Sequence, residues 1–190
     1  MSYVIEVLRQ EHSSIERLLR VLERELNIFD RGDRPNYEVI LAVIDYFEDY
    51  PDRCHHPKED VIFENLKARN AVAAATVGDL KGEHREEARR LRRVAKAIRD
   101  VLSDQAMLRE AVVDIIRDFI DHERQHMALE ESLFFPAALN ALRAEDWADV
   151  ALKLADQSDP LVRPSVEEKF SILRRHIMEL EEEAKAGTPG

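Results

Sequence analysis

The stretch HHPKEDVIF at residues 55–63 holds the pattern on which the interpretation of this chain depends. In it, His55 stands four residues before Glu59, and residues at this spacing share one face of a helix. The stretch HMALEESLFFP at residues 126–136 repeats the arrangement with His126 and Glu130, and a phenylalanine follows each glutamate by four residues. Each stretch can therefore direct one imidazole and one carboxylate at the same point.

A lone histidine precedes each of these pairs at nearly the same interval. His12 stands before His55, and His84 stands before His126. The order of one histidine followed by a His-x-x-x-Glu pair thus occurs twice. This doubling predicts two helical hairpins that are related by a pseudo-twofold axis and supply the same set of side chains.

Apolar residues recur at steps of three, four and seven through most of the chain, which is the period of an amphipathic helix. The predicted long helices cover residues 3–30, 36–68, 71–103 and 104–142. Gly32 and Pro35 separate the first two, and Asp104 is the predicted N-cap of the fourth. Pro51 and Pro57 fall inside the second helix, so we expect a kink or a locally altered turn there.

Short connections between long helices are typical of an up-down-up-down four-helix bundle. Counting residues outward from each connection, at about 1.5 Å per residue, brings four histidines to one height. These four are His12, His55, His84 and His126. Four unrelated core histidines would rarely share a layer, so the layer itself predicts a site.

The pattern changes toward the C-terminal end. A short helix is predicted at residues 145–157, and Ser165 and Glu168 form a capping-box pair that would open a last helix. We therefore divide the chain into a four-helix bundle over residues 1–143 and a C-terminal helical extension over residues 144–190. The extension is expected to pack on the bundle or on a partner. The predicted fold class is all-α.

Composition limits the expected partners and compartment. The 190 residues include 28 basic and 39 acidic side chains, which gives a net charge of −11. Such a surface repels phosphate backbones, so nucleic acid is not an expected partner. No apolar stretch approaches the ~18 residues that span a bilayer, so no membrane segment is expected. With a single cysteine and no leader-like start, the chain is predicted to be cytoplasmic.

A buried layer of four imidazoles and two carboxylates costs free energy unless its polar groups are satisfied. Facing glutamates also repel each other unless cations lie between them. A pair of cations would let Glu59 and Glu130 bridge and would leave the histidines as terminal ligands, since imidazole suits iron, zinc and copper. The metal-free alternative pairs each histidine with the glutamate that follows it. The doubled pattern and the shared layer favour metal.

Four short motifs carry a resemblance to a known family. They are EHSSI at residues 11–15, HHPKEDVIF at 55–63, GEHR at 82–85 and HMALEESLFFP at 126–136. Together they resemble the hemerythrin HHE cation-binding family over about residues 5–147. The resemblance implies a non-haem di-iron site in which Glu59 and Glu130 are the bridging carboxylates. The terminal ligands that it implies are His12, His55, His84 and His126.

The chain departs from the oxygen-carrying hemerythrins at two positions. The pattern typical of those proteins has five histidines. One of them lies one turn after the third-helix ligand, where this chain has Ala88. The second bridging carboxylate is Glu130 rather than an aspartate. These differences argue against simple reversible oxygen carriage. They agree better with bacterial HHE-type proteins, whose family roles cover oxygen, peroxide, nitric oxide and iron handling.

His56 is an additional candidate ligand. On an ideal helix it would point about 100° away from His55, but Pro57 can turn it inward. In some hemerythrin-like domains this position resembles an extra ligand. The alternative is a hydrogen-bonded pair of His56 with Asp60.

Other side chains near the pattern have less specific expectations. His122, one turn before His126, is expected to be a ligand, a donor that orients a glutamate, or a partner for a neighbouring acid. Cys54 is expected to be a buried inert thiol, and His176 a surface residue. Aromatic residues flank the pattern and are expected to pack around the site. They are Tyr46, Tyr50, Phe63, Phe134 and Phe135.

The sequence thus predicts a protein that holds two non-haem iron ions, with zinc or manganese as alternatives. It would bind a small diatomic ligand such as oxygen, or peroxide, for sensing, storage or delivery, and a homodimer stays open. One rival is a di-iron oxidoreductase acting on peroxide or nitric oxide. Another is a structural or interaction bundle held by zinc. The candidate metal ligands are His12, His55, His56, Glu59, His84, His126 and Glu130.

Overall fold

The structure, a computed structural model, describes residues 2–156, 170, 173–179 and 182. These residues form helices with short connections, and they contain no strand. In chain order the elements are α1 (Tyr3–Asp30), α2 (Tyr37–Tyr50), η1 (Pro51–His55), α3 (His56–Arg69), α4 (Ala71–Val77), α5 (Leu80–Leu102), α6 (Arg109–Leu129), η2 (Glu130–Phe134), α7 (Phe135–Ala141) and α8 (Ala144–Asp156). The elements η1 and η2 are single π-helical turns. The described part of the chain is therefore all-α, as predicted.

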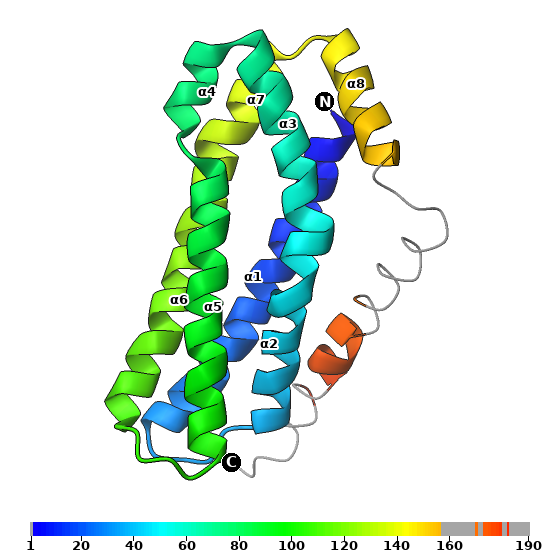
Figure 1. Cartoon of the computed structure of the whole chain (residues 1–190). Coiled ribbons are helices and arrows are strands. Elements are labelled where there is room, and N and C mark those ends of the chain that lie inside the picture. Colours follow the sequence, from blue (N-terminus) through cyan, green and yellow to red (C-terminus); the bar gives the residue numbers. More distant parts are fainter. Residues whose placement is uncertain (1, 157–169, 171–172, 180–181, 183–190) are drawn as a thin grey trace.

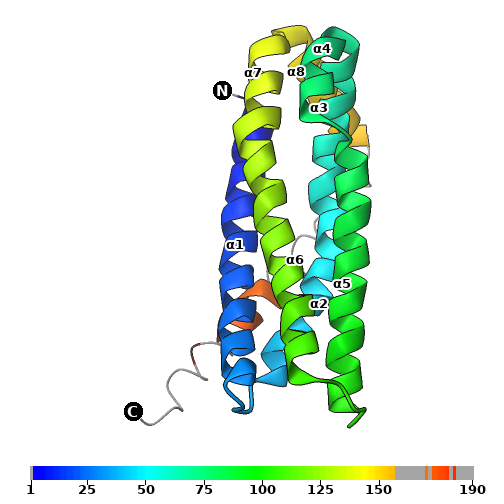
Figure 2. The same cartoon turned by 90° about the vertical axis from the view of Figure 1, so that its left-hand side faces the viewer.

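Four long helical rods run side by side and alternate in direction (Figure 1). The first rod is α1, the second is α2 continued by η1 and α3, the third is α5, and the fourth is α6 continued by η2 and α7. In the view turned by 90°, α6 lies between α1 and α5 (Figure 2). This is the predicted up-down-up-down four-helix bundle, and the structure confirms it.

The first connection is short because two residues fix its backbone. Gly32 has a φ of 93°, in the left-handed region that glycine adopts without strain. The side chain of Asn36 accepts a hydrogen bond from the Val39 N–H at 3.2 Å and so caps α2. The buried carboxylate of Glu25 accepts a hydrogen bond from the Asn36 N–H at 2.7 Å. The chain therefore turns back at once, and α2 packs along α1.

A π-helical turn interrupts both the second and the fourth rod. The first begins at Pro51, which has no N–H to contribute to the helix, and ends at His55. The second begins at Glu130. Each π turn thus contains one member of a His-x-x-x-Glu pair. The altered turn predicted at Pro51 and Pro57 is confirmed, and the second π turn is likewise followed by a proline, since Pro136 lies two residues after its end as Pro57 does after the first.

The third predicted helix is divided in two by a glycine. Gly78 has a φ of 95° and separates α4 from α5. The side chain of Asp79 then caps α5 by accepting a hydrogen bond from the Gly82 N–H at 3.0 Å. This break determines where α5 begins, and hence the height of His84 in the bundle.

The sequence predicts helix starts at Asp104 and at Ser165. The predicted N-cap at Asp104 is wrong, because Asp104 lies in the turn after α5 with a φ of 53° and α6 begins at Arg109. A short polar side chain tolerates this left-handed conformation, so the aspartate serves the turn and not the helix. The predicted capping box of Ser165 and Glu168 lies outside the described residues.

The hydrophobic core is divided into two clusters along the bundle. One lies toward the α1–α2 connection and includes Leu22 and Phe119. The other lies toward α4 and α7 and includes Leu8, Ile62 and Phe134. A layer of buried polar side chains lies between the two clusters, so the layer has packed apolar side chains on both sides along the bundle.

The start of the C-terminal extension packs on the second rod. α8 lies against α3, where Arg69 donates hydrogen bonds to Asp146 at 2.7 Å and to Glu145 at 3.0 Å (Figure 1). Val150 of α8 is fully buried. The domain boundary at residue 143 stays a prediction. None of the described helices combines the length and the apolar character that a bilayer crossing requires.

Replacing Gly78 by alanine should lower the free energy of unfolding by about 1–2 kcal/mol. A Cβ at this position would meet no atom within 4 Å, so the cost would come from backbone strain alone. Urea unfolding followed by circular dichroism measures the change. Val72→Ala, at an exposed position of α4, is the control and should shift stability by less than about 0.5 kcal/mol. Equal midpoints for the two variants would contradict this role of Gly78.

Candidate metal centre

The six side chains of the doubled pattern meet in the polar layer between the two hydrophobic clusters. All six are buried, with at most 8% of their surface exposed. Each rod contributes to the set, which comprises His12 from α1, His55 and Glu59 from η1 and α3, His84 from α5, and His126 and Glu130 from α6 and η2. Residues far apart in the sequence are thus brought to one height, as the counting of residues along the helices predicts.

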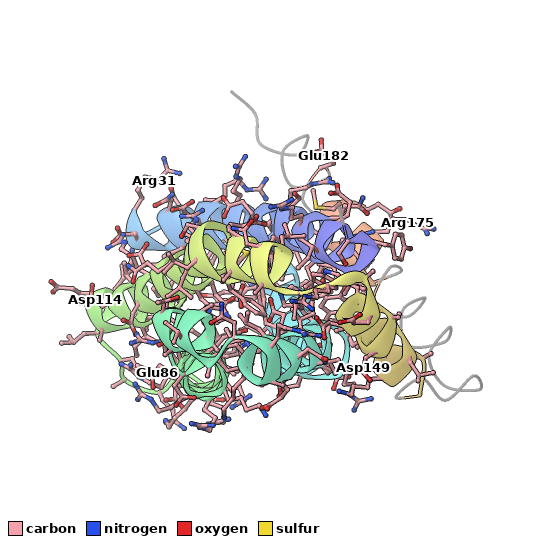
Figure 3. All side chains as sticks on the ribbon, turned by 90° about the horizontal axis from the view of Figure 1, so that it is seen from above. Arg31, Glu86, Asp114, Asp149, Arg175 and Glu182 are labelled. Carbon is pink, nitrogen blue, oxygen red and sulfur yellow. The ribbon has the colours of Figure 1, made fainter. Side chains whose placement is uncertain are left out.

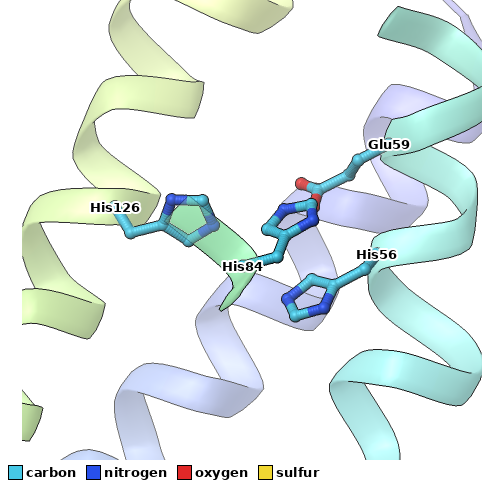
Figure 4. A group of neighbouring side chains, drawn as sticks. All are labelled: His56, Glu59, His84 and His126. Carbon is cyan, nitrogen blue, oxygen red and sulfur yellow. The ribbon is translucent and has the colours of Figure 1, made fainter. Parts of the chain in front are cut away.

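The nitrogen and oxygen atoms of this layer form two groups. Within each group the donor atoms lie within 4.8 Å of one another. The first group comprises His12, His55, Glu59 and Glu130, and the second comprises His56, Glu59, His84 and His126. Figure 4 shows the second group, whose side chains converge from three of the rods. Glu59 belongs to both groups, which makes it a bridge between them.

Both glutamates reach histidines on each side of the layer. Glu59 Oε1 lies 3.4 Å from His55 Nε2, and its Oε2 lies 3.3 Å from His84 Nε2. Glu130 Oε2 lies 3.2 Å from His12 Nε2, and its Oε1 lies 3.1 Å from His126 Nε2. Each carboxylate therefore presents one oxygen to each group, which is the arrangement that a bridging carboxylate requires.

Many of these atoms lack a hydrogen-bond partner among the described residues. They are both carboxylate oxygens of Glu59, both of Glu130, and the Nε2 atoms of His84 and His126. A buried polar atom left unsatisfied costs roughly 1–3 kcal/mol. Imidazole nitrogens and carboxylate oxygens are ligands for iron, zinc and manganese. The residues present therefore fit a pair of cations, which would satisfy all of these atoms together.

The two glutamates differ in their protonation. Burial and the negative charge of Glu130 raise the pKa of Glu59 well above its ordinary value of 4.5. Burial also opposes ionisation of Glu130, but the imidazoles of His12, His126 and His84 close to its carboxylate outweigh it and hold the pKa of Glu130 low. Without cations, one proton thus remains on the pair and prevents two buried negative charges from facing each other.

Polar partners outside the layer orient two of the histidines. Nδ1 of His55 lies 2.8 Å from a carboxylate oxygen of Glu11, and Nδ1 of His12 lies 3.0 Å from Glu131. Arg9 in turn donates to Glu131 at 3.0 Å. A carboxylate on Nδ1 directs Nε2 of each ring into the layer and raises the basicity of the ring as a ligand.

His56 lies in the second group but is engaged by two carboxylates. Its Nδ1 is 3.2 Å from Asp52 and its Nε2 is 3.2 Å from Glu87. Burial alone would lower its pKa, but these two partners raise the pKa to about 9. The alternative pairing with Asp60 is wrong, because Asp52 one turn earlier takes that place. The ring of His56 stacks on the ring of His84, with their centroids 3.8 Å apart.

Two buried carboxylates next to the second group are not singled out by the sequence pattern. Glu87 is one turn after His84 and lies 3.9 Å from His126 Nε2, and Glu123 is one turn before His126. Both are at most 5% exposed. Burial and the nearby charge of Glu87 raise the pKa of Glu123 well above its ordinary value. Each lies three residues from a candidate ligand, which was the available clue. The sequence alone does not distinguish a buried glutamate at such a position from the solvated glutamates around it.

The remaining singled-out side chains surround the layer. Nε2 of His122 is buried without a hydrogen-bond partner among the described residues, but His122 belongs to neither group. Cys54 is buried, and His176 is exposed as predicted. Phe135 stacks on the ring of His12 with the centroids 5.4 Å apart, so an aromatic side chain closes one side of the layer.

A comparison with known families agrees with this geometry. The family model described as Hemerythrin HHE cation binding domain matches residues 3–138 of the chain. The chain belongs to this family. The match includes residues of all four rods and every residue of the two groups. This hemerythrin-family domain therefore binds cations. No curated protein and no solved structure was found to match the chain.

Metal uptake by this hemerythrin-family centre should release protons and strengthen as the pH rises. The raised pKa of Glu59 means that cations must displace a proton to reach its carboxylate. The same shift stabilises the metal-free fold below pH 4.5, and this contribution is lost as the pH rises through the higher folded pKa. Calorimetric metal titration in buffers of different ionisation enthalpy counts the protons. Glu59→Gln should release fewer, and equal release would contradict the assignment.

Glu87→Gln should weaken binding of one of two cations by roughly 10- to 100-fold, because Glu87 orients or completes the second group. Competition with a chelator of known affinity measures each step. Glu86→Gln is the matched control, since Glu86 lies on the outside of α5, where it pairs with Arg89 (Figure 3). An affinity in Glu87→Gln as high as that in Glu86→Gln would mean that Glu87 takes no part.

Proposed function

We propose that this hemerythrin-family chain holds two non-haem iron ions and binds oxygen or a related small ligand. The single observation that supports this most is the placement of Glu59 and Glu130, each with one oxygen toward each group of donors. Such a shared carboxylate pair suits two hard, charged ions held side by side. A pair of iron ions would supply a redox-active position for a diatomic molecule or peroxide.

The residues around the proposed site bury it and orient its histidines. His12 is covered by Phe135, and Glu59 and Glu130 have no exposed surface. Water is thereby kept from the buried side of the layer, and electrostatic interactions there are stronger than at the surface. These features support a site that admits a small ligand and excludes larger ones, which suits sensing, storage or delivery.

Two ions are favoured over a single structural zinc ion by the donor set. Structural zinc sites are almost always closed and tetrahedral, with one ion held by four ligands. Here two groups share one carboxylate, and three histidines gather in the second group. A lone tetrahedral ion would leave most of the unsatisfied atoms of the other group without a partner.

Protein expressed with added iron should contain two iron ions per chain, and its optical spectrum should change when oxygen is admitted. Glu59→Gln and Glu130→Gln should each lower the iron count, because each removes a bridge between the groups. Glu64→Gln is the control, since Glu64 is exposed and pairs with Lys81. An unchanged iron count in both bridge variants would overturn the proposal, and one zinc ion per chain would favour the structural alternative.

Removal of the metal should lower the melting temperature by several degrees, because bound metal contributes folding free energy. Differential scanning calorimetry before and after chelation measures the loss. The shift should be smaller in Glu130→Gln than in Glu64→Gln. Turnover of peroxide or nitric oxide by the iron-loaded protein would assign it to the oxidoreductase alternative, and binding without turnover would assign it to sensing or storage.

A further inference from the structure

Lys58 belongs to the HHPKEDVIF stretch but to neither of the two groups of donor atoms. It lies next to Glu59 on α3, and only 7% of its surface is exposed. A lysine is almost never buried unless its charge is paired, because taking an ammonium group out of water costs free energy. The partners of Lys58 therefore indicate what this buried charge does.

The ammonium group of Lys58 joins the first and second rods beside the metal layer. Its Nζ donates to Oε1 of Glu11 on α1 at 2.6 Å, and it also donates to the carbonyl oxygen of Cys54 in the π turn η1. The side chains of Lys58 and Glu11 are only 9% and 14% exposed, so salt and water screen this ion pair little. The carboxylate of Glu11 is thereby held in one place.

The other oxygen of Glu11 reaches a candidate metal ligand. Oε2 of Glu11 lies 2.8 Å from Nδ1 of His55. A carboxylate can only accept, so this contact is a hydrogen bond when Nδ1 carries the hydrogen, and Nε2 of the neutral ring then keeps its lone pair. Nε2 of His55 lies 3.2 Å from Nε2 of His12 and 3.4 Å from Oε1 of Glu59, within the first group. Glu11 thus leaves Nε2 of His55 ready to bind a cation.

His12 is oriented by a second series of the same kind. Its Nδ1 lies 3.0 Å from Glu131, which accepts a hydrogen bond from Arg9 at 3.0 Å. Both histidines of the first group therefore have a carboxylate on Nδ1 and a cationic side chain on that carboxylate. In the second group, by contrast, Nδ1 of His126 has no hydrogen-bond partner among the described residues. The series is thus a feature of the first group and not of every histidine in the layer.

We propose that Lys58 is a positioning residue of the first group. It fixes Glu11 between α1 and η1, and Glu11 holds His55 in the tautomer whose Nε2 is free to bind a cation. Lys58 acts through Glu11 and is not itself a ligand, because an ammonium group has no lone pair. The effect of Lys58 on a bound pair of ions rests on the proposed function, whereas its effect on the tautomer of His55 does not.

The charge of Lys58 distinguishes this role from that of a bystander. A buried positive charge beside a cation site repels the cation, so by charge alone the removal of Lys58 would strengthen cation binding. The loss of a group that orients a ligand weakens binding instead, by roughly 10- to 100-fold. The two roles therefore predict changes of opposite sign.

The tautomer of His55 is measured from the imidazole nitrogen signals in NMR spectra of the metal-free full-length protein. In the wild-type chain His55 should be the Nδ1–H tautomer, and the Nε2–H tautomer there would overturn the proposal before any variant is made. Lys58→Met keeps an unbranched apolar side chain but lacks the ammonium group, so Glu11 should turn toward solvent and His55 should become a mixture of both tautomers. A folded Lys58→Met protein in which His55 keeps the wild-type tautomer would overturn the role of Lys58.

Two controls test whether the effect is confined to this series. Lys67→Met removes an exposed charge from the same helix and should leave His55 unchanged. His12 should keep its own tautomer in Lys58→Met, because Glu131 still holds its Nδ1. Tautomer changes at both histidines would mean that the whole layer has loosened, which would contradict a positioning role.

Cation affinity is measured by titration with Co²⁺ in competition with a chelator of known affinity. Lys58→Met should weaken one of two bound ions by roughly 10- to 100-fold relative to Lys67→Met. Binding of both ions that is as strong as in Lys67→Met, or stronger, would overturn the positioning role. A wild-type chain that binds fewer than two ions would instead contradict the proposed function, and the tautomer of His55 in the metal-free protein would still decide the role of Lys58.

Discussion

The structure depends on the burial of two facing carboxylates, Glu59 and Glu130, at the level where all four rods contribute side chains to one layer. Neither has any exposed surface, and their oxygens lack hydrogen-bond partners among the described residues. Without cations, one proton must remain on the pair, because two negative charges cannot share this site. The hydrophobic clusters on either side keep the pair buried, so the cost of the layer is met by the packing of the whole bundle.

Local backbone features determine the height and direction of the ligands. The π turns at Pro51–His55 and Glu130–Phe134 lie where the second and fourth rods enter the layer, and each changes the direction of the side chains that follow. Gly78 ends α4 and determines the start of α5, which carries His84. A family of cation-binding bundles is thereby recognisable in the spacing of a few residues, although most of the chain only has to be helical.

The pseudo-twofold symmetry of the sequence is broken in the structure. On one side, His12 and His55 are oriented by Glu131 and Glu11, which are both partly exposed. On the other, His84 and His126 share their surroundings with buried acids, among them Glu87. Two cations held here would therefore have different surroundings.

The sequence by itself determined the helices, their alternating order and the layer of six side chains, because helical periodicity and the rise per residue are local properties of the backbone. It could not show that Glu87 is buried beside His56, that His56 pairs with Asp52, or that Glu123 lies next to Glu87. Those facts depend on how far each rod is rotated and on which neighbour it faces. Rotation is decided by packing between helices, which only the tertiary structure shows.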